Sequence, residues 1–491
     1  MRRIYLVRHG LPEKSTSEKE YIGVTDLPLS MRGRAEARQL GSCFLQHIQS
    51  VNAVERTDRT FAKNRIRQDA SSVEPWLLAE QQAKRKHADA QANVRVRILT
   101  SPLQRCRQTA EEIHRVLSDR GIALTEPHVV EALHEIDLGD WEGKSVREIR
   151  ERFPEEYEAR GHALGTYHTP GGESFLEAGV RFQKAIDAIL KSADRSEMAA
   201  DGKQSSGMGS DGNESSRVGE IDARSSDADE EEIILVIAHA GVIRAYLSLL
   251  MGRDLDHLMD LPLPYASVTE LEVCRKAVDS EGLRPPEKYG VGDDEKVDRE
   301  HGSEDADIKT CREEICVLPD GIGVRPEELL DAAEIARLYQ KYRTPQQVIR
   351  HMRKVAEVAD RLMDGMKMCG SRGRVMKACL LHDLCRAEKQ HARMSAEAIR
   401  MEGYPAIAAL VAVHHQAAYS EREAQGPLTE AELLFYADKR VQEDVLVSVE
   451  ERFRESRKKC RSPEACAHHD AMLAKTLKIE KKIIKETGDE I

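Results

Sequence analysis

Four residues in the first half of the chain are of the types that phosphoryl transfer through a histidine needs. Such a reaction requires a neutral ring nitrogen that attacks phosphorus, cations that hold the phosphate oxygens, and a proton donor for the leaving oxygen. His9 is the candidate nucleophile, and Arg8, Arg105 and His239 are the candidate phosphate-binding residues. An arginine offers a fork of donors, so Arg105 is suited to bind two phosphate oxygens at once.

These residues follow apolar runs that predict short buried strands. The runs are Ile4–Val7, Val94–Thr100 and Ile233–Ala238. Open α/β sheets hold ligands at the C-terminal ends of their parallel strands, so we expect His9, Arg105 and His239 to meet at that edge. Arg105 opens a predicted helix that ends near Leu117. Gly10 is expected to let the backbone and a phosphate approach closely.

A carboxyl group between Leu133 and Gly139 is the candidate proton donor. Glu135 lies just before a predicted loop, and Glu131 competes with it for this role. A carboxylic acid in a cationic pocket needs shielding to keep its proton near neutral pH, so we expect Glu135 to be part-buried. We interpret Trp141 as a packing residue beneath the loop.

The C-terminal third carries a second set of chemically active residues, all histidine or aspartate. The candidate metal ligands are His351, His382, Asp383, His391, His414 and Asp438. A helix is predicted to open at Thr344-Pro345, and a second, over 375–384, carries two of the ligands. Adjacent helical positions point about 100° apart, so both reach one metal only near the centre of a bundle.

Imidazole and carboxylate ligands without thiolates suit Mn²⁺, Fe²⁺, Co²⁺ or Mg²⁺ better than structural zinc. A metal pair held in this way would polarise a phosphoryl group and supply hydroxide. For His415 we expect a supporting or structural role, and for His468 and His469 a solvated surface. Cys460 and Cys466 precede that pair of histidines, and we interpret the resulting zinc-like spacing as incidental.

The first half resembles the histidine phosphatase superfamily, which has the phosphoglycerate-mutase-like fold. Five motifs occur in the family's order: LVRHG, SPLQRCRQTA, LHEIDLGDWEG, TPGGES and VIAHAGVIR. The resemblance covers about residues 1–273 apart from two inserts. It implies His9 as the phosphorylated residue, Arg8, Arg105 and His239 as the phosphate pocket, Glu135 in preference to Glu131 as the acid, and Thr25 as a substrate-loop contact.

Within that superfamily, the stretches GVTDLPLS, EIDLGDWEG and PGGES look most like the α-ribazole phosphatase and fructose-2,6-bisphosphatase branch. The mutases typically carry a Glu-x-x-Tyr-Gly loop, whereas here Leu138 precedes Gly139. The resemblance therefore favours hydrolysis over mutase chemistry. It implies a phosphomonoester hydrolase that needs no cofactor, and α-ribazole phosphate or a related small phosphorylated metabolite is one candidate substrate.

Residues 344–453 resemble the HD-domain metal-dependent phosphohydrolases. The family pattern of a His, a His-Asp pair and a distant Asp maps onto His351, His382-Asp383 and Asp438. Members with two metals add later histidines, and His391 and His414 are the matching positions. The resemblance implies a divalent metal and an activity on a nucleotide or a phosphorylated cofactor.

Composition narrows the class of protein. The 491 residues are 33% charged and 4% aromatic with a net charge of -12, and no basic stripe is evident, which argues against nucleic acid as a partner. No run approaches the roughly 18 apolar residues of a membrane span. The first strand starts at once, without room for a signal peptide, and the ten cysteines form no CxxC pair. We expect a cytoplasmic protein whose partners are small phosphorylated metabolites.

We therefore expect two domains: an α/β fold with a mostly parallel sheet flanked by helices, and an all-α bundle. Their predicted ranges are 1–275 for the phosphatase domain, with irregular inserts at about 50–93 and 196–232, 276–325 for a linker, and 326–491 for the HD domain. Two alternatives stay open. The first domain could be a phosphoglycerate-type mutase, or the protein could be regulatory, with an HD domain that binds a nucleotide without hydrolysing it.

Overall fold

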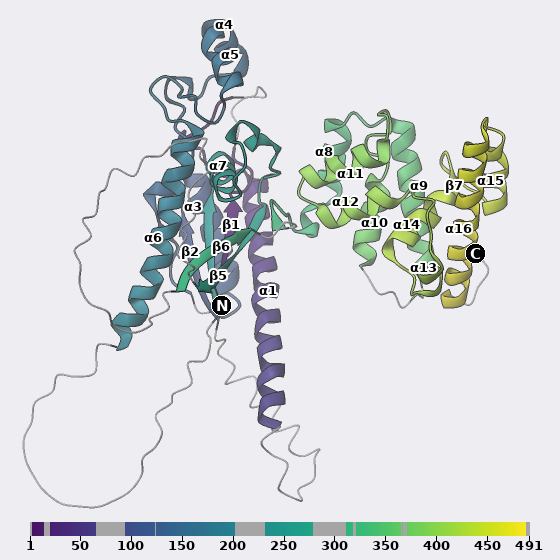
Figure 1. Cartoon of the computed structure of the whole chain (residues 1–491), viewed down its shortest axis with the longest axis horizontal. Coiled ribbons are helices and arrows are strands. Elements are labelled where there is room, and N and C mark those ends of the chain that lie inside the picture. Colours follow the sequence, from purple (N-terminus) through teal and green to yellow (C-terminus); the bar gives the residue numbers. More distant parts are fainter. Residues whose placement is uncertain are drawn as a thin grey trace, which may run out of the picture. The chain divides into compact units, whose positions relative to one another are not determined.

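A computed structural model of the chain describes residues 2–13, 20–64, 94–122, 124–201, 231–277, 311–317, 321–364, 366 and 371–487 (Figure 1). Contacts divide the chain into two compact units. They are Met1–Asp260 with Val268–Ile322, and Leu261–Ser267 with Gly323–Ile491. Among the described helices, none combines the length and the apolar character that crossing a bilayer requires.

The first unit is built on one six-stranded sheet with the strand order β3-β2-β4-β1-β5-β6. Neighbouring strands among β1 to β4 run parallel, whereas β5 and β6 are antiparallel additions at one side. The strands are β1 (Arg2–Arg8), β2 (Val94–Thr100), β3 (His128–Val129), β4 (Glu231–Ala238), β5 (Val268–Ala277) and β6 (Cys311–Val317). The mostly parallel sheet predicted from the sequence is confirmed.

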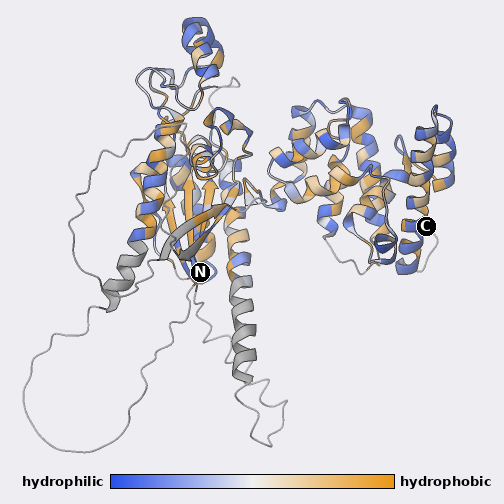
Figure 2. Cartoon of the chain, in the orientation of Figure 1, coloured by the Kyte–Doolittle hydropathy of each residue, from blue (hydrophilic) through white to orange (hydrophobic). Residues whose placement is uncertain are grey.

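The central strand β4 is apolar on both faces, because helices cover the sheet on both sides (Figures 1 and 2). On one face, the Tyr5 ring packs edge-on against Phe44 of α1, with ring centroids 5.5 Å apart. On the other face, Leu99 borders α6. The described helices of this unit are α1 (Met31–Asn64), α3 (Gln104–Ser118), α4 (Val146–Arg152), α5 (Pro154–His162), α6 (Phe175–Asp201) and α7 (Ala240–Leu250), with short 3₁₀ turns η1 (Glu131–Leu133), η2 (Gly139–Trp141) and η3 (Leu255–Asp260).

Regular structure extends into three stretches that were expected to be irregular. α1 continues to Asn64 and α6 to Asp201, inside the predicted inserts. The remainder of each insert, 65–93 and 202–230, lies outside the described residues. In the predicted linker 276–325, Cys311–Val317 forms β6 and pairs antiparallel with β5. That part of the linker is therefore an edge strand of the sheet.

The second unit is a helical bundle with one small hairpin. Its core is a single cluster of buried apolar side chains that includes Met352, Val375, Ile399 and Phe435. The helical domain predicted for this region is thus confirmed. Its elements are η6 (Glu327–Leu329), α8 (Ala332–Lys341), α9 (Gln346–Leu362), α10 (Arg372–Leu381), α11 (His391–Met401), α12 (Pro405–Val413), α13 (Glu421–Gln425), α14 (Glu430–Lys439), β7 (Val441–Gln442), β8 (Val445–Leu446), α15 (Val449–Arg457) and α16 (Pro463–Thr487).

Candidate active site and candidate metal centre

The C-terminal ends of three neighbouring strands carry the phosphate-site candidates of the first unit. β4 pairs in parallel with β1 and with β2, in a register that aligns Ala238 with Arg8 and Ile237 with Thr100. The next residues, His9 and His239, therefore come together, and their ring centroids lie 5.1 Å apart. Their exposed fractions are 4% and 0%, and that of Arg105 is 2%. Side chains from distant parts of the sequence thus share one buried site.

The His9 ring has one nitrogen committed to the backbone. Nδ1 lies 2.8 Å from the carbonyl oxygen of Gly10, and a carbonyl only accepts, so Nδ1 carries the hydrogen. Burial, with the Arg105 and Arg8 guanidinium groups, holds the pKa of His9 well below 6.5. The ring is therefore neutral at neutral pH, and Nε2 keeps its lone pair.

Gly10 has a structural role that the sequence did not indicate. A Cβ at this position would lie 2.4 Å from the carbonyl oxygen of Gly33, in the first turn of α1. The absence of a side chain thus lets the chain after β1 approach α1, and the expected close approach of a phosphate stays a prediction. Ser30 caps this helix as its N-terminal residue, because its Oγ accepts a hydrogen bond from the Gly33 amide.

Arg105 and His239 are in direct contact. Arg105 Nε donates to His239 Nδ1 at 3.1 Å, so the hydrogen of the neutral imidazole lies on Nε2, 2.8 Å from Ser101 Oγ. Burial and the Arg105 charge keep the pKa of His239 well below 6.5. The two terminal nitrogens of Arg105 donate to the carbonyl oxygens of Thr25 and Gly23, each at 2.6 Å.

Glu135 lies at the N-terminus of α7. Its Oε2 accepts a hydrogen bond from the Gly241 amide at 3.0 Å, and its Oε1 accepts one from Val242 at 2.8 Å. The side chain is buried, as expected, whereas the competing Glu131 is exposed. A Cβ at Gly241 would lie 2.6 Å from Oε1 of Glu135, so this glycine makes the room for the carboxyl group.

The Thr25 hydroxyl is bonded within the protein, and its expected contact with a substrate stays a prediction. Arg244 is a cation that the sequence reasoning missed. The Thr25 hydroxyl donates to Glu142 Oε2 at 2.5 Å, which commits this donor to the protein. Burial and the Arg8 charge lower the pKa of Arg244 to about 10, while Glu135 acts in the opposite direction. Arg244 therefore lies within electrostatic reach of both Arg8 and Glu135. Its place in the run HAGVIR, one turn into α7, was the available signal.

A half-buried arginine of α5 lies among three aromatic rings. The Arg160 guanidinium is 5.4 Å from the ring centroid of Tyr21, 5.8 Å from Trp141 and 5.6 Å from Phe175. Among the described residues, no carboxylate forms an ion pair with it. One of these rings, that of Phe175, also lies close to Gly241, whose amide bonds Glu135. Trp141 is fully buried, as expected of a packing residue.

Three imidazoles of the second unit present the same nitrogen to one region. Nδ1 of His351, His382 and His414 lies 2.8, 2.8 and 2.5 Å from the carbonyl oxygens of Glu443, Cys379 and Val411. Carbonyls accept, so each Nδ1 carries its hydrogen and each Nε2 is available as a ligand. His351 Nε2 lies 3.1 Å from Asp438 Oδ1, and His382 Nε2 lies 3.7 Å from the same oxygen.

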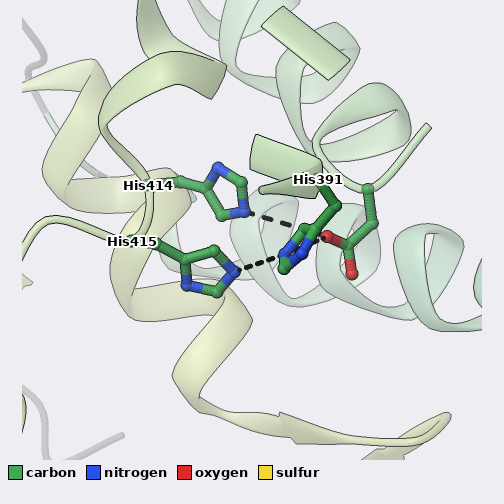
Figure 3. A group of neighbouring side chains, drawn as sticks. His391, His414 and His415 are labelled. Atoms are coloured by element: carbon green, nitrogen blue, oxygen red, sulfur yellow. Dashed lines mark hydrogen bonds and ion pairs between the residues drawn. The ribbon is translucent and has the colours of Figure 1, made fainter. Parts of the chain in front are cut away.

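Asp383 also belongs to a second group of candidate ligands, with His391, His414 and His415. Figure 3 shows the three histidines of this group. Oδ1 of Asp383 is 3.3 Å from His391 Nε2 and 3.9 Å from His414 Nε2. His415 Nε2 is 2.9 Å from His391 Nε2, so His415 lies among the potential ligands and not behind them as expected. α10 ends at Leu381, which places His382 and Asp383 in the following turn and not within a helix.

The residues fit a divalent metal. In the described part of the chain, Nε2 of His382, Nε2 of His414 and Oδ1 of Asp383 are buried atoms without a hydrogen-bond partner. Two groups of ligand atoms each lie within 4.8 Å of one another, and Asp383 belongs to both. Burial lowers the pKa of His414 to about 2 and that of His415 to about 4, so both rings are neutral, the form that ligates a metal.

The cysteine and histidine residues near the C-terminal end form no such group among the described residues. Cys460 and Cys466 are free thiols, and His468 is exposed, as expected. His469 differs from the expected solvated position. Its exposed fraction is 10%, and its Nε2 lies 3.0 Å from the Phe453 carbonyl oxygen. This ring therefore holds α15 against α16.

Comparison with known families identifies both units. The model of the histidine phosphatase superfamily, branch 1, matches residues 4–62, 78–200 and 214–283, just over half of the 491 residues. The chain therefore belongs to the histidine phosphatase superfamily. The HD domain model matches residues 348–442, so the second unit contains an HD domain.

Curated relatives match the chain in part. Sedoheptulose 1,7-bisphosphatase of Saccharomyces cerevisiae is 26% identical over 189 residues, which are 38% of this chain and 55% of that protein. The human 6-phosphofructo-2-kinase/fructose-2,6-bisphosphatase 1 is 26% identical over 271 residues, 55% of this chain and 37% of that protein. The chain thus spans about half of the yeast relative and a smaller share of the human one.

Solved structures align with the chain at low overall similarity. The α-ribazole phosphatase from Shigella flexneri is 18% identical with a TM-score of 0.32, and covers 55% of this chain and 91% of its own. A mycobacterial glucosyl-3-phosphoglycerate phosphatase is 20% identical with a TM-score of 0.32, and covers 55% of this chain and 89% of its own.

Proposed function

We propose that the first unit hydrolyses phosphomonoesters through a phosphohistidine at His9. The observation that carries this proposal is the state of the His9 ring, which is buried and neutral with Nδ1 bound to the Gly10 carbonyl. Nε2 is therefore the nucleophilic atom. Arg8, Arg105 and His239 bind the oxygens of the transferred phosphoryl group and offset its charge.

The reaction proceeds in two displacements. In the first, the Nε2 lone pair of His9 forms a bond to phosphorus while the bond from phosphorus to the ester oxygen breaks. Glu135, as the carboxylic acid, donates its proton to the departing alkoxide, which leaves as an alcohol. In the second, Glu135, now a carboxylate, takes a proton from water as the water oxygen attacks phosphorus. The bond to Nε2 breaks, inorganic phosphate leaves and neutral His9 is restored.

Replacing the nucleophile tests this proposal in the full chain. His9→Ala should abolish the phosphatase activity that resists a metal chelator, while the metal content of the HD domain stays the same. Incubating the wild-type chain with labelled substrate should yield acid-labile, alkali-stable protein-bound phosphate, which the variant lacks. Chelator-resistant activity retained in His9→Ala would remove the nucleophile assignment.

We further propose that the substrate carries a second anionic group. Arg160 supports this, as a half-buried cation among aromatic rings that bonds Tyr21 and for which the described residues supply no carboxylate. A phosphate or carboxylate on the substrate would add an anionic partner. The yeast and human relatives are named as bisphosphatases, which agrees with this substrate class. α-Ribazole phosphate remains a candidate that rests on loop resemblance alone.

For the second unit we propose a metal-dependent phosphohydrolase that acts on a nucleotide or a phosphorylated cofactor. His351, His382 and Asp383 would hold one ion, together with Asp438, which contacts both of these histidines. Asp383 with His391, His414 and His415 would hold another. Bound divalent ions would polarise a phosphoryl group and activate water. Asp383 lies between the two groups and keeps their ligand atoms together.

The two activities can be separated in one chain. In His9→Ala protein loaded with Mn²⁺, Fe²⁺, Co²⁺ or Mg²⁺, a panel of nucleotides and phosphorylated cofactors should reveal release of phosphate or pyrophosphate that a chelator abolishes. Tight binding of an intact nucleotide without any turnover would instead favour the regulatory alternative for this domain.

A further inference from the structure

Glu142, which directly follows η2, gathers hydrogen bonds from a segment more than a hundred positions earlier. Its Oε1 accepts from the Val24 amide at 2.8 Å. Its Oε2 accepts from the Gly23 amide at 3.1 Å, from the Thr25 amide at 3.3 Å and from the Thr25 hydroxyl at 2.5 Å. Three consecutive amides thus point at one carboxylate, an arrangement in which a short backbone segment encloses an anion.

The carbonyl groups of the same segment, residues 23–25, bind Arg105. The carbonyl oxygens of Gly23 and Thr25 each accept a hydrogen bond of 2.6 Å from a terminal nitrogen of the Arg105 guanidinium. Arg105 Nε in turn contacts His239 Nδ1. Glu142 orients the amides, the peptide planes orient the carbonyls, and the carbonyls fix the plane of the guanidinium. Within the described part of the chain, Glu142 itself forms no hydrogen bond or ion pair with His9, Arg105 or His239.

Two further observations show that the segment is built for close contact with Glu142. A Cβ at Gly23 would lie 2.3 Å from Glu142 Oε1 and 2.2 Å from the Ile136 carbonyl oxygen. Only glycine therefore lets the segment reach the carboxylate. The next residue, Asp26, accepts a hydrogen bond of 2.6 Å from the Gln104 amide beside Arg105. The segment is thus fixed at the carboxylate and at the start of α3.

We propose that Glu142 is a positioning residue for phosphoryl transfer, which sets the orientation of Arg105 through residues 23–25. The proposal rests on the proposed phosphatase function of the first unit. In an interior of low dielectric constant, a cation contributes to binding phosphate oxygens only if its donors already point at them. Releasing residues 23–25 would leave the Arg105 charge in place and lose the direction of its donors.

Glu142→Gln is the discriminating variant. The side-chain amide keeps one acceptor oxygen, but its NH₂ group would replace the other. Some of the backbone N–H groups of residues 23–25 would then face a donor and lose their acceptor. We expect kcat/KM for p-nitrophenyl phosphate to fall at least tenfold and the inhibition constant of orthovanadate to rise in parallel. Glu148→Gln, on α4 nearby, is the matched control, because Glu148 bonds the exposed Arg152 and should leave both values unchanged.

A double-mutant cycle separates positioning from a general loss of structure. If Glu142 acts through Arg105, Glu142→Gln should cost less than twofold in a chain that already carries Arg105→Lys. Full additivity of the two losses, or unchanged kinetics in Glu142→Gln, would overturn the proposal. Should Glu142→Gln fold poorly, Glu142→Asp, which keeps the carboxylate, is placed in the same cycle and judged by the same criterion.

Two different outcomes would contradict the phosphatase function and the positioning role of Glu142. A wild-type chain without activity that depends on His9 would sink the function itself. An active wild-type chain in which Glu142 and Arg105 behave independently would sink only the positioning role.

Discussion

Arg105 donates a hydrogen bond of 3.1 Å from Nε to Nδ1 of His239, although 134 positions separate the two residues. The contact assigns the neutral tautomer of His239 and fixes the guanidinium plane at one edge. Both side chains are buried, so contacts within the protein, and not water, set their orientations. The electrostatic behaviour of the phosphate site therefore depends on this pair acting together.

Replacing the guanidinium with an ammonium should expose that dependence. Arg105→Lys keeps the charge but loses the forked geometry and the bond to His239. We expect kcat for phosphomonoester hydrolysis to fall about 100-fold, the usual effect of removing one preorganised donor. Steady-state kinetics check this. Arg107→Lys, at an exposed position of α3, should retain wild-type rates.

Gly241 makes room for the carboxyl group of Glu135. The rate lost when this room is filled should therefore depend on the leaving group of the substrate. Gly241→Ala would put a Cβ 2.6 Å from Oε1 of Glu135 and displace the proton donor. We expect the rate with an alkyl phosphate to fall about 100-fold or more, as when a general acid is lost. p-Nitrophenyl phosphate should be affected far less, because its leaving group needs little protonation. Equal losses on both substrates would contradict the acid role.

The buried histidines predict a stability that depends on pH. The folded-state pKa values of His9 and His239 lie below 6.5, so as the pH falls below 6.5 the unfolded chain binds more protons than the folded one. The free energy of unfolding should then decrease by up to about 1.4 kcal/mol per pH unit for each histidine. This stability is fully present above pH 6.5 and is lost on acidification.

Tryptophan fluorescence can follow this effect in the intact chain, because Trp76 and Trp141 both lie in the first half of the sequence. Urea unfolding between pH 6.5 and 5 should show a shallower pH dependence in the double variant His9→Asn/His239→Asn than in the wild type. Identical slopes in the two chains would show that these rings titrate normally.

Arg160 predicts selectivity between substrates. Arg160→Gln should raise KM about tenfold or more for a substrate with a second phosphate, because a charged hydrogen bond contributes about 1.5–3 kcal/mol. KM for p-nitrophenyl phosphate, which has no second anion, should stay near the wild-type value. Arg152→Gln on α4 is the matched control. A uniform change across both substrates would argue for a packing role alone.

Asp383 lies between the two ligand groups, so its loss should weaken both. Asp383→Ala should lower the metal bound per chain, measured by elemental analysis after dialysis, without changing the activity that depends on His9. Asp360→Ala, at an exposed position of α9, should bind the wild-type amount. Unchanged stoichiometry in Asp383→Ala would remove this residue from the ligand set.

Much of the first unit followed from local sequence. The strand predicted over 94–100 matches β2 at both ends. The edge strand β6 was missed because CREEICV carries three charged residues in seven. Charged side chains are common on edge strands, where one row of backbone groups faces solvent, and in a single sequence they resemble a linker.

The contacts that define the geometry of the site were harder to predict from the sequence. The bonds of Glu135 to the Gly241 and Val242 amides involve backbone donors, and every residue but proline carries such a donor. Glu142 also accepts its hydrogen bonds mainly from backbone amides, and its residue type alone indicates only a polar loop position. His415 was expected to have a supporting or structural role. The turn after α12 brings it beside His414, with ring centroids 4.1 Å apart.

The strand at the middle of the sheet is the fourth in chain order. β4 lies between β1 and β2, yet 130 residues follow β2 before it begins. A ribosome that has made the first two hundred residues has therefore supplied β1 and β2 without the strand that lies between them. The phosphate site is complete only when β4, which His239 directly follows, has been made and has paired with both neighbours. These pairings join residues far apart in the sequence, and contacts of that kind slow folding.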